Sequence, residues 1–472
     1  MAGRLGSSRY GASEFANVEG QEAEKPVSEI KPMQFTLWLA TSLGFGLLAV
    51  RFHHHAIKVV LFLATAVPYV ASDLVTGYSG GFLDLHPATW FALFAFIVAS
   101  LIRPREVLKL IGRDPVPNFL MATVLSIVVA TVVVRDGSSG LSLIANQMVV
   151  PYAVFLWARF EIRRDSRFGA SLARFVVGLG AIESALALFQ WATKTTLFFT
   201  TQMSTYGWYR LNVRQFGTLD HPLTLSLLLA ICIPLSVNIR RAYFQVPVVV
   251  LLLIGVLLTE SRTGLLLAAA GLAFLLLRKQ ASVKTRIAAC GALGLGLILF
   301  FQSSLAEGIA ARLDNDNGSA NARSLALKFF FENVWHYFLG GDGVGSSFET
   351  SSNGGLATSL ESPVLMYALD FGLLVTLIYF GVQLVLVLRW KRGWTATSGA
   401  RAGALFAVLS IQTYSSVATE SAAALLVWAV IGIATLSLTQ EDNPESPNAH
   451  TRGRRIHSGQ FGQKRATPGQ PD

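Results

Sequence analysis

The sequence has few charged residues and almost no cysteine. Asp, Glu, Lys and Arg make up 14% of its 472 residues, whereas a soluble protein carries about a quarter. This shortage excludes an ordinary water-soluble protein of this length. The two cysteines, Cys232 and Cys290, both lie in apolar runs. We interpret them as small packing residues, which argues against a disulfide framework or a cysteine metal site.

Acidic residues are also scarcer than basic ones, 28 against 38, which gives a formal net charge of +10. This excess does not indicate nucleic-acid binding, because membrane proteins concentrate Lys and Arg in their cytoplasmic loops. What the chain has in abundance is apolar side chains, at 52% of its residues. The composition therefore predicts an all-α polytopic bundle of transmembrane helices, with membrane lipids as its surroundings.

Apolar stretches recur along the whole chain. A transmembrane helix needs about 20 mostly apolar residues. The candidate stretches are 33–50, 57–75, 87–102, 117–134, 141–158, 170–193, 222–238, 243–259, 263–277, 286–303, 363–389, 402–418 and 421–439. Several are short, so we expect 11–13 spans, and about 12 if 33–50 is a shallow or re-entrant segment.

The distribution of Lys and Arg predicts which loops face the cytoplasm. Basic residues gather at 103–113, 158–167, 238–244, 278–286 and 389–394. The positive-inside rule places these segments in the cytoplasm. The two long loops, and the tight turn that contains Arg262, then face the opposite side of the membrane.

The chain divides into seven predicted segments. Residues 1–32 are polar and lack the apolar core of a cleavable signal peptide. In order, we predict a disordered polar tail (1–32), N-terminal transmembrane helices (33–193), a first outer loop (194–221), central transmembrane helices (222–303), a large, partly helical outer loop (304–362), C-terminal transmembrane helices (363–440) and a disordered basic cytoplasmic tail (441–472).

Several arginines lie on the predicted outer side. Arg210 and Arg214 are in the first long loop, Arg262 is in the tight turn, and Arg323 is in the second long loop. The planar guanidinium group suits bidentate contacts to phosphate. Each arginine alone could simply extend to the membrane interface. Their accumulation on one side favours a site for a phosphate-bearing ligand.

One carboxylate and two histidines are candidate catalytic residues. Glu361 precedes a predicted span, so its simplest role is a carboxylate at a helix N-terminus, with Ser359 or Ser362 as the capping partner. The alternative is a general base beside the arginines. His221 and His336 are rival candidates, although packing or interfacial hydrogen bonding is the commoner role for either.

No metal ion or cofactor is predicted. His53, His54 and His55 are adjacent, and three adjacent histidines cannot all face one site. The glycine-rich stretch 340–355 lacks the Gly-Lys-Ser/Thr of a P-loop, and 314–321 is out of register for a calcium loop. We interpret both stretches as flexible parts of the second outer loop.

Four segments together resemble one protein family over roughly residues 90–440. They are RQFGTLDHPLTLSLLLAICIPL, LTESRTGLLLAAAGLAFLLL, ARSLALKFFFENVWHYFLGGDGVGSSF and ESPVLMYALDFGLL, in this order. An enlarged loop separates the last two. In these features the chain resembles the bacterial O-antigen ligase and O-antigen or exopolysaccharide polymerase superfamily.

The resemblance implies a membrane glycosyltransferase at the periplasmic face of the inner membrane. Its donor would be an oligosaccharide on undecaprenyl pyrophosphate, and arginines would neutralise the leaving pyrophosphate without a metal. On this basis we predict pyrophosphate contacts from Arg214 and Arg262, then from Arg323 and Arg210. Glu361 would be the general base for the acceptor hydroxyl. A chain-length regulator and export proteins would be partners.

The resemblance leaves polymerase and ligase open. Ligases of this family begin the fourth segment with His, where this chain has Glu361, which favours a polymerase. A ligase that transfers the glycan to a final acceptor is the alternative. A polysaccharide or lipid flippase is a third hypothesis, but its typical internal repeats are not evident. The ionisable residues also gather at one face, which favours an enzyme.

Overall fold

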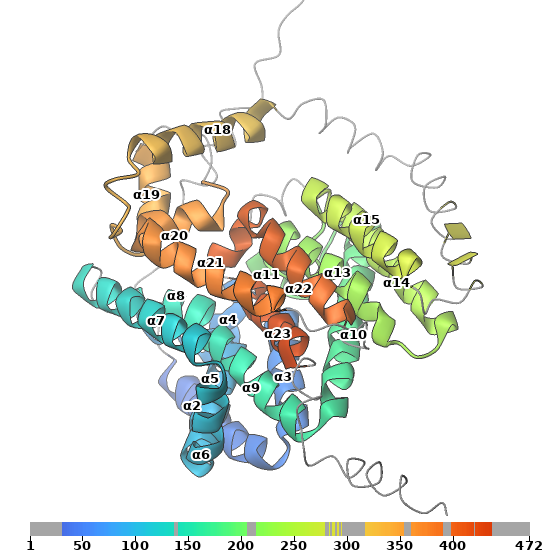
Figure 1. The fold of residues 1–472 in the computed structure, drawn as a ribbon, viewed down its shortest axis with the longest axis horizontal. Coiled ribbons are helices and arrows are strands. Elements are labelled where there is room, and N and C mark those ends of the chain that lie inside the picture. The colour runs from blue at the N-terminus through green and yellow to red at the C-terminus, as the bar shows by residue number, and fades with distance from the viewer. Residues whose placement is uncertain are drawn as a thin grey trace, which may run out of the picture.

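The computed structural model describes residues 31–135, 140–204, 214–278, 317–353, 360–389, 398–419 and 421–436, with a few single positions between 283 and 294. These described parts are helical and contain no strand, which confirms the all-helical prediction (Figure 1). Among them, four helices are long and apolar enough to cross a membrane, or five if one bent pair is a single span. Shorter apolar helices accompany these. The chain is therefore a helical membrane protein, and the number of spans stays a prediction.

Prolines begin most of the N-terminal helices. The helices are α2 (Pro32–Arg51), α3 (His53–Ala66), α5 (Pro87–Ile102), α6 (Pro104–Arg113) and α7 (Pro115–Arg135). A proline at the first helical position loses no hydrogen bond, because its missing N–H would have no partner there. The predicted span 57–75 is not one helix. After α3, a turn at Pro68 leads into η1 (Tyr69–Ala71) and α4 (Ser72–Thr76), at an angle of 94°.

The next two helices are the longest of those described. Residues Leu141–Arg164 form one 24-residue candidate span, made of α8 (Leu141–Ile144), a π-helical stretch (Ala145–Val149) and α9 (Val150–Arg164). The wide π turn ends two residues before Pro151, whose ring is incompatible with a regular turn preceding it. The helix α10 (Ser166–Thr193) follows, with 28 residues.

The C-terminal half contains two breaks that the sequence pattern did not predict. Its helices are α13 (Pro222–Leu235), α14 (Ala242–Leu258), α15 (Arg262–Leu277), α20 (Pro363–Phe371), α21 (Leu373–Leu388), α22 (Ser398–Ser410) and α23 (Ala423–Leu436). The predicted span 363–389 is interrupted at Gly372, whose φ is +99°. The predicted span 402–418 ends as a helix at Ser410 and continues as the 3₁₀ turns η4 (Ile411–Thr413) and η5 (Ser415–Ala418). The predicted span 286–303 lies almost entirely outside the described residues.

The core forms around α13 and α23. Every residue of α13 from Thr224 to Leu235 is buried, and the helix packs against α10, α14, α15 and α22. A helix that is apolar on all sides belongs in an interior. Gly180 of α10 contacts Cys232, which is fully buried and unpaired, so the predicted packing role of this cysteine is confirmed.

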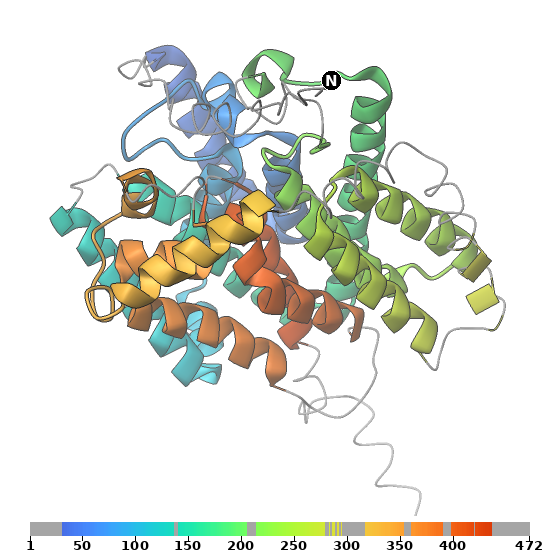
Figure 2. The same cartoon turned by 90° about the horizontal axis from the view of Figure 1, so that it is seen from above.

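Two helices lie within the predicted second outer loop. They are α18 (Asn317–Glu332) and α19 (Ser346–Asn353). In Figure 1, α18 lies at the top of the molecule, above α19 and α20, and Figure 2 shows it on the side nearest the viewer. The N-terminal end of α15 also points to this side. The helices therefore bring three of the four family-like segments toward one face.

A candidate site at the N-terminal ends of α13, α15 and α20

The loop before α13, residues 214–221, is anchored to α10. Gln190 Oε1 accepts hydrogen bonds from the N–H groups of Phe216 (3.1 Å) and Gly217 (3.2 Å). Glu183, only 3% exposed, accepts from the N–H of Thr218 at 3.0 Å. Gly217 has φ +63°, and a Cβ there would overlap the Glu183 carboxylate. A glycine is therefore required where the loop approaches α10.

The other side of this loop is bonded to the end of α14. Arg214 Nε donates to the carbonyl oxygen of Thr259 at 2.9 Å, and the N–H of Gln215 donates to that of Leu258 at 3.0 Å. Thr259 is three residues before Arg262. The structure therefore brings Arg214 close to the turn that carries Arg262. Two arginines must lie close together if they are to contact one ligand, as the sequence analysis predicts.

The turn between α14 and α15 fixes Arg262 at the start of its helix. Ser261 caps α15, and its side chain accepts a hydrogen bond from the N–H of Gly264 at 3.1 Å. Glu260 has φ +49°, a conformation that non-glycine residues seldom adopt. Gly264 packs so closely on α13 that a Cβ would overlap Ser226. The buried Tyr414 hydroxyl interacts with Ser226 and Ser261.

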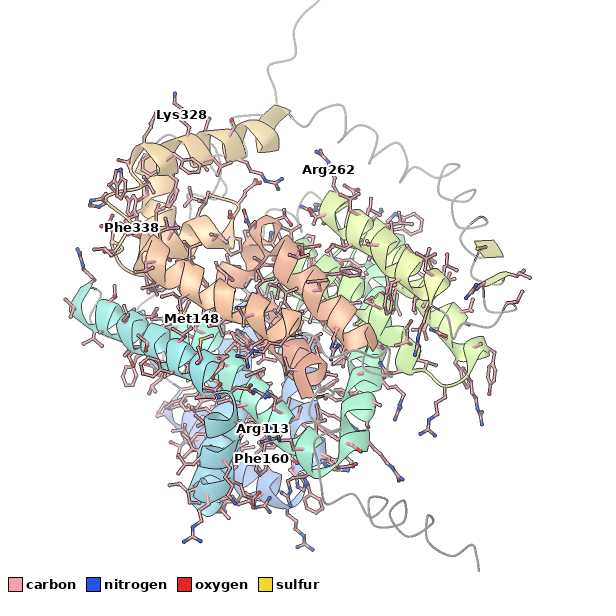
Figure 3. The ribbon with its side chains drawn as sticks, in the orientation of Figure 1. Arg113, Met148, Phe160, Arg262, Lys328 and Phe338 are labelled. Carbon is pink, nitrogen blue, oxygen red and sulfur yellow. The ribbon has the colours of Figure 1, made fainter. Side chains whose placement is uncertain are left out.

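Arginine is electrostatically unfavourable at the first position of a helix. The N-terminal end of a helix carries a partial positive charge, which disfavours a cation and attracts an anion. Arg262 is partly exposed there, and Figure 3 shows it pointing away from the helical body, toward the same side as Lys328. Helix stability alone therefore does not explain this arginine, and the arrangement suits an anionic ligand.

Glu361 pairs with Arg323. The Arg323 Nε lies 2.8 Å from Glu361 Oε2, and the two side chains are 49% and 22% exposed. The Ser362 side chain makes no capping hydrogen bond to α20, although Pro363 occupies the first turn as predicted. Glu361 itself has φ +49°. Ser362 is therefore not the capping partner, Ser359 lies outside the described residues, and the Glu361 carboxylate pairs with an arginine of α18.

The glycine-rich stretch packs on the break between α20 and α21. The N–H groups of Asp342 and Gly343 donate to the carbonyl oxygens of Leu369 (2.9 Å) and Asp370 (3.1 Å). Asp370 Oδ1 in turn accepts from the N–H of Ser347 at 3.0 Å. A Cβ on Gly341 would overlap the Asp370 backbone. The expectation of a flexible stretch is therefore wrong for residues 341–347, which are held by these hydrogen bonds.

The two candidate histidines have different surroundings. The Nδ1 atom of His221 accepts the N–H of Leu223 at 3.0 Å and so caps α13. Burial, and then the charge of Arg214, lower the pKa of His221 to about 3. In this state Nε2 carries the hydrogen, which does not favour His221 as a base. His336 is 65% exposed, and its Nε2 lies 3.3 Å from Asp342 Oδ1. The predicted contact residue Arg210 lies outside the described residues.

The segment 411–418 contacts both the turn before α15 and the helix α20. Tyr414 reaches the Ser261 turn, and the carbonyl oxygen of Val417 accepts a hydrogen bond from Tyr367 of α20 at 3.2 Å. We call Arg214, Arg262, Arg323 and Glu361 the arginine site. The sequence-based prediction named these four residues. It did not assign Glu183 and Gln190 as the anchors of the loop, although their spacing of seven residues places both on one face of α10.

Comparison with known families places part of the chain in one of them. Residues 247–382, less than a third of the chain, match the model of a family described as O-antigen ligase. No curated protein matches the chain in sequence. The matched segment runs from α14 into α21, and it contains the Arg262 turn together with Arg323 and Glu361. The chain thus carries an O-antigen ligase domain, which supports its membership of the superfamily of O-antigen ligases and polymerases.

Proposed function

We propose that the protein polymerises oligosaccharide repeat units at the periplasmic face of the bacterial inner membrane. The units would be linked to undecaprenyl pyrophosphate, and the product would be an O-antigen, a capsule or an exopolysaccharide. One observation carries the proposal. Within a chain that has an O-antigen ligase domain, Arg214 is bonded to the turn that presents Arg262 at a helix N-terminus.

The arginines are suited to bind the pyrophosphate of the donor. The hydrogen bond from Arg214 Nε to Thr259 fixes the plane of that guanidinium. Arg262 adds a second cation, and the N-terminal end of α15 adds the partial charge of its N–H groups. Fixed cations stabilise the negative charge that develops on a departing pyrophosphate. We assign the same role to Arg323 and, in the first outer loop, to Arg210.

The proposed reaction is a single glycosyl transfer. The acceptor hydroxyl oxygen attacks the anomeric carbon of the donor, and the bond from that carbon to the pyrophosphate oxygen breaks. Glu361 accepts the proton of the hydroxyl, and the pyrophosphate leaves with the electron pair. Arg323, 2.8 Å from Glu361, orients the carboxylate. Neither His221, which caps α13, nor the exposed His336 is needed as the base in this scheme.

The alternative is a ligase that transfers the finished glycan to a final acceptor. The description of the matched family favours it. Glu361, at the position where ligases of the family carry His, favours the polymerase. We also propose a chain-length regulator and export proteins as partners of either enzyme. The seven segments predicted from the sequence are our proposed organisation of the chain.

A complementation assay separates these functions. A strain without the native gene receives wild type, Arg214→Ala, Arg262→Ala or Glu361→Gln at matched membrane levels, and its surface and lipid-linked glycans are resolved on gels. Arg278→Ala, at the opposite end of α15, is the matched control. We expect the three variants to accumulate single lipid-linked units and lose long chains, while the control behaves as wild type.

The other outcomes contradict specific parts of the proposal. Long chains that stay on the lipid carrier would identify a ligase. Normal glycan in all three variants would show that the arginines only extend to the membrane interface, and the proposed site would then be wrong.

A further inference from the structure

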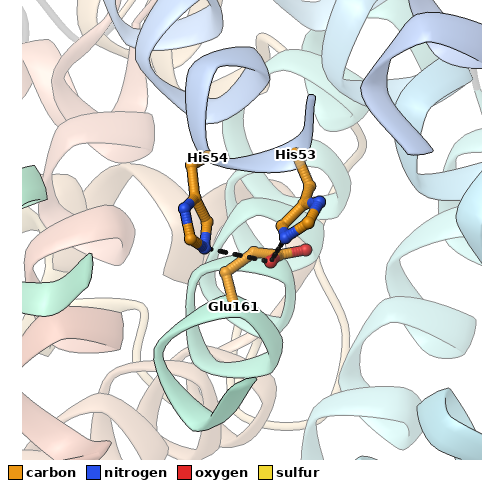
Figure 4. A group of neighbouring side chains, drawn as sticks. All are labelled: His53, His54 and Glu161. Carbon is orange, nitrogen blue, oxygen red and sulfur yellow. Dashed lines mark ion pairs between the residues drawn. The ribbon is translucent and has the colours of Figure 1, made fainter. Parts of the chain in front are cut away.

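Two adjacent histidines and a buried glutamate lie close together at the N-terminal end of α3. His53 and His54 begin this helix, and Glu161 lies in the last turn of α9 (Figure 4). The distances from Glu161 Oε2 to the Nε2 atoms of His53 and His54 are 3.2 and 3.9 Å. One nitrogen of each histidine and one carboxylate oxygen all lie within 4.8 Å of one another. We call these three residues the His–Glu cluster.

Hydrogen bonding does not account for this arrangement. Trp157, one turn earlier on α9, donates a side-chain hydrogen bond to Glu161. The Oε2 atom of Glu161 and the Nε2 atom of His54 are nevertheless buried without a hydrogen-bond partner among the described residues. The Glu161 side chain is only 2% exposed. The contacts to Glu161 Oε2 are ion pairs only if the histidine is protonated, and a buried polar atom without a hydrogen bond is costly unless a ligand satisfies it.

We propose that His53, His54 and Glu161 bind one divalent transition-metal ion of the Zn²⁺ type. Imidazole nitrogen and carboxylate oxygen are the donors that such ions take in sites with three protein ligands. Bond lengths near 2.1 Å place neighbouring donors around a tetrahedral ion about 3.4 Å apart. The distances from Glu161 Oε2 to the Nε2 atoms of His53 and His54, 3.2 and 3.9 Å, lie on either side of this value.

A small cavity adjoins two of the three cluster residues, His53 and Glu161. His53, Glu161 and Arg103 line it together with apolar side chains of α2, α5 and α9, and its volume of about 10 Å³ admits about one water molecule. We take water or hydroxide from this space as the fourth ligand. Arg103 favours the anionic form by its charge.

Sequence reasoning rejected this site because three adjacent histidines cannot face one ion. The structure needs only two of them, and His55 is exposed on the other side of the helix. The cluster also lies apart from the arginine site. The 14 residues of α3 separate it by about 20 Å from the end of the helix at Ala66, beside the loop that precedes α13. A metal here would tie α3 to α9 and take no part in the glycosyl transfer.

The test is a metal titration of the full-length protein. The protein is purified in detergent with a tag that contains no histidine, treated with a chelator and titrated with Zn²⁺ against a chromophoric competitor. Co²⁺ then serves as a spectroscopic probe of the coordination geometry. We expect one equivalent of Zn²⁺ to bind and tetrahedral Co²⁺ absorption to appear. His53→Ala, His54→Ala and Glu161→Gln should each weaken binding at least tenfold, while the matched control His55→Ala should not.

Two results would overturn the inference. One is wild-type protein that binds no metal at about 100 μM, and the other is binding that the three cluster variants leave unchanged. A second measurement, on wild type and the His55→Ala control alone, protects the test if a cluster variant misfolds. Binding to the native state raises the melting temperature, so Zn²⁺ must stabilise both wild type and His55→Ala, and the absence of that shift also rejects the site.

Discussion

Arginines pair with carboxylates at both ends of the helical body, but in different surroundings. Asp114, between α6 and α7, contacts Arg159 of α9 and lies 2.7 Å from Arg389 at the end of α21. The Arg159 side chain is 3% exposed. At the other end, Arg323 and Glu361 are 49% and 22% exposed. A buried pair cannot separate without stranding a charge, whereas a half-exposed pair can exchange its partner for a ligand.

The difference separates a structural role from a functional one. We call Asp114, Arg159 and Arg389 the Asp114 clamp, because one carboxylate joins three parts of the chain. Burial raises the pKa of Asp114, but the hydrogen bond and charge of Arg159, with the charge of Arg389, outweigh it and leave the pKa below its ordinary value. Changes in the clamp should therefore affect stability, and changes in the arginine site should affect activity.

The largest expected effect is the loss of the clamp. Asp114→Ala strands the buried Arg159, and removal of one partner from a buried pair costs roughly 3–5 kcal/mol. We expect the free energy of unfolding, measured in detergent, to fall by this amount. The activity per folded molecule should be unchanged. Arg389→Ala should cost less, because that side chain is 44% exposed. A loss below about 1 kcal/mol for Asp114→Ala would show that the clamp is not structural.

The next prediction concerns the charges of Arg323 and Glu361 in the arginine site. Arg323→Ala and Glu361→Gln should each lower activity about 10²-fold, because both act on charge in the transition state. Their stability should change by less than about 1 kcal/mol, since the pair is partly exposed. The double variant Arg323→Glu with Glu361→Arg restores an ion pair but not the two separate roles. If polymer formation returned in this double variant, the pair would be merely structural.

Two neighbouring glycines test how the glycine-rich stretch supports the site. Gly341→Ala should destabilise the protein by about 1–3 kcal/mol, because the new Cβ would overlap the Asp370 backbone. Gly340→Ala is the matched control, since a Cβ there meets nothing within 4 Å. Thermal unfolding of the two variants side by side measures the difference. Equal melting temperatures would mean that residues 341–343 do not pack on the helix break.

The smallest expected effect is on pH dependence. His221 is neutral when folded, with a pKa of about 3, and has an ordinary pKa of 6.5 when unfolded. The unfolded state therefore binds more protons between these values, and stability present above pH 6.5 is lost as the pH falls toward 3. The loss is on the order of 1 kcal/mol near pH 5.5. His221→Asn keeps a capping side chain that does not titrate. As the pH falls, the melting temperature of this variant should therefore decrease less steeply than that of wild type.

His86 offers an internal comparison for this last experiment. It also precedes a proline, and its Nδ1 accepts the N–H of Ala88 at 3.1 Å at the start of α5. Burial lowers the pKa of His86 to about 4. His221→Asn should therefore remove only part of the decrease in melting temperature as the pH falls. An unchanged slope would mean that His221 titrates normally and does not cap α13.

Local patterns in the sequence predicted the parts of the site that depend on one segment at a time. The turn before α15, with Arg262 at the start of an apolar helix, follows from a polar Ser-Arg-Thr-Gly run between apolar stretches. Pro363 at the first position of α20 follows from the preference of helices for proline there. The break at Gly372 was missed, because apolar residues continue on both sides and hydropathy does not register the positive φ of one glycine.

The sequence by itself determined that the chain is a helical membrane protein, where most of its helices lie and which arginines are conspicuous, because hydropathy and helix starts are local properties. Only the tertiary structure decided the partners of those residues. Arg214 meets Thr259, Glu183 meets Thr218, and Asp114 meets Arg389 across 275 positions of the chain. Such contacts arise from how whole helices pack, and no local periodicity specifies them. For the same reason, only packing revealed that two of three adjacent histidines face Glu161.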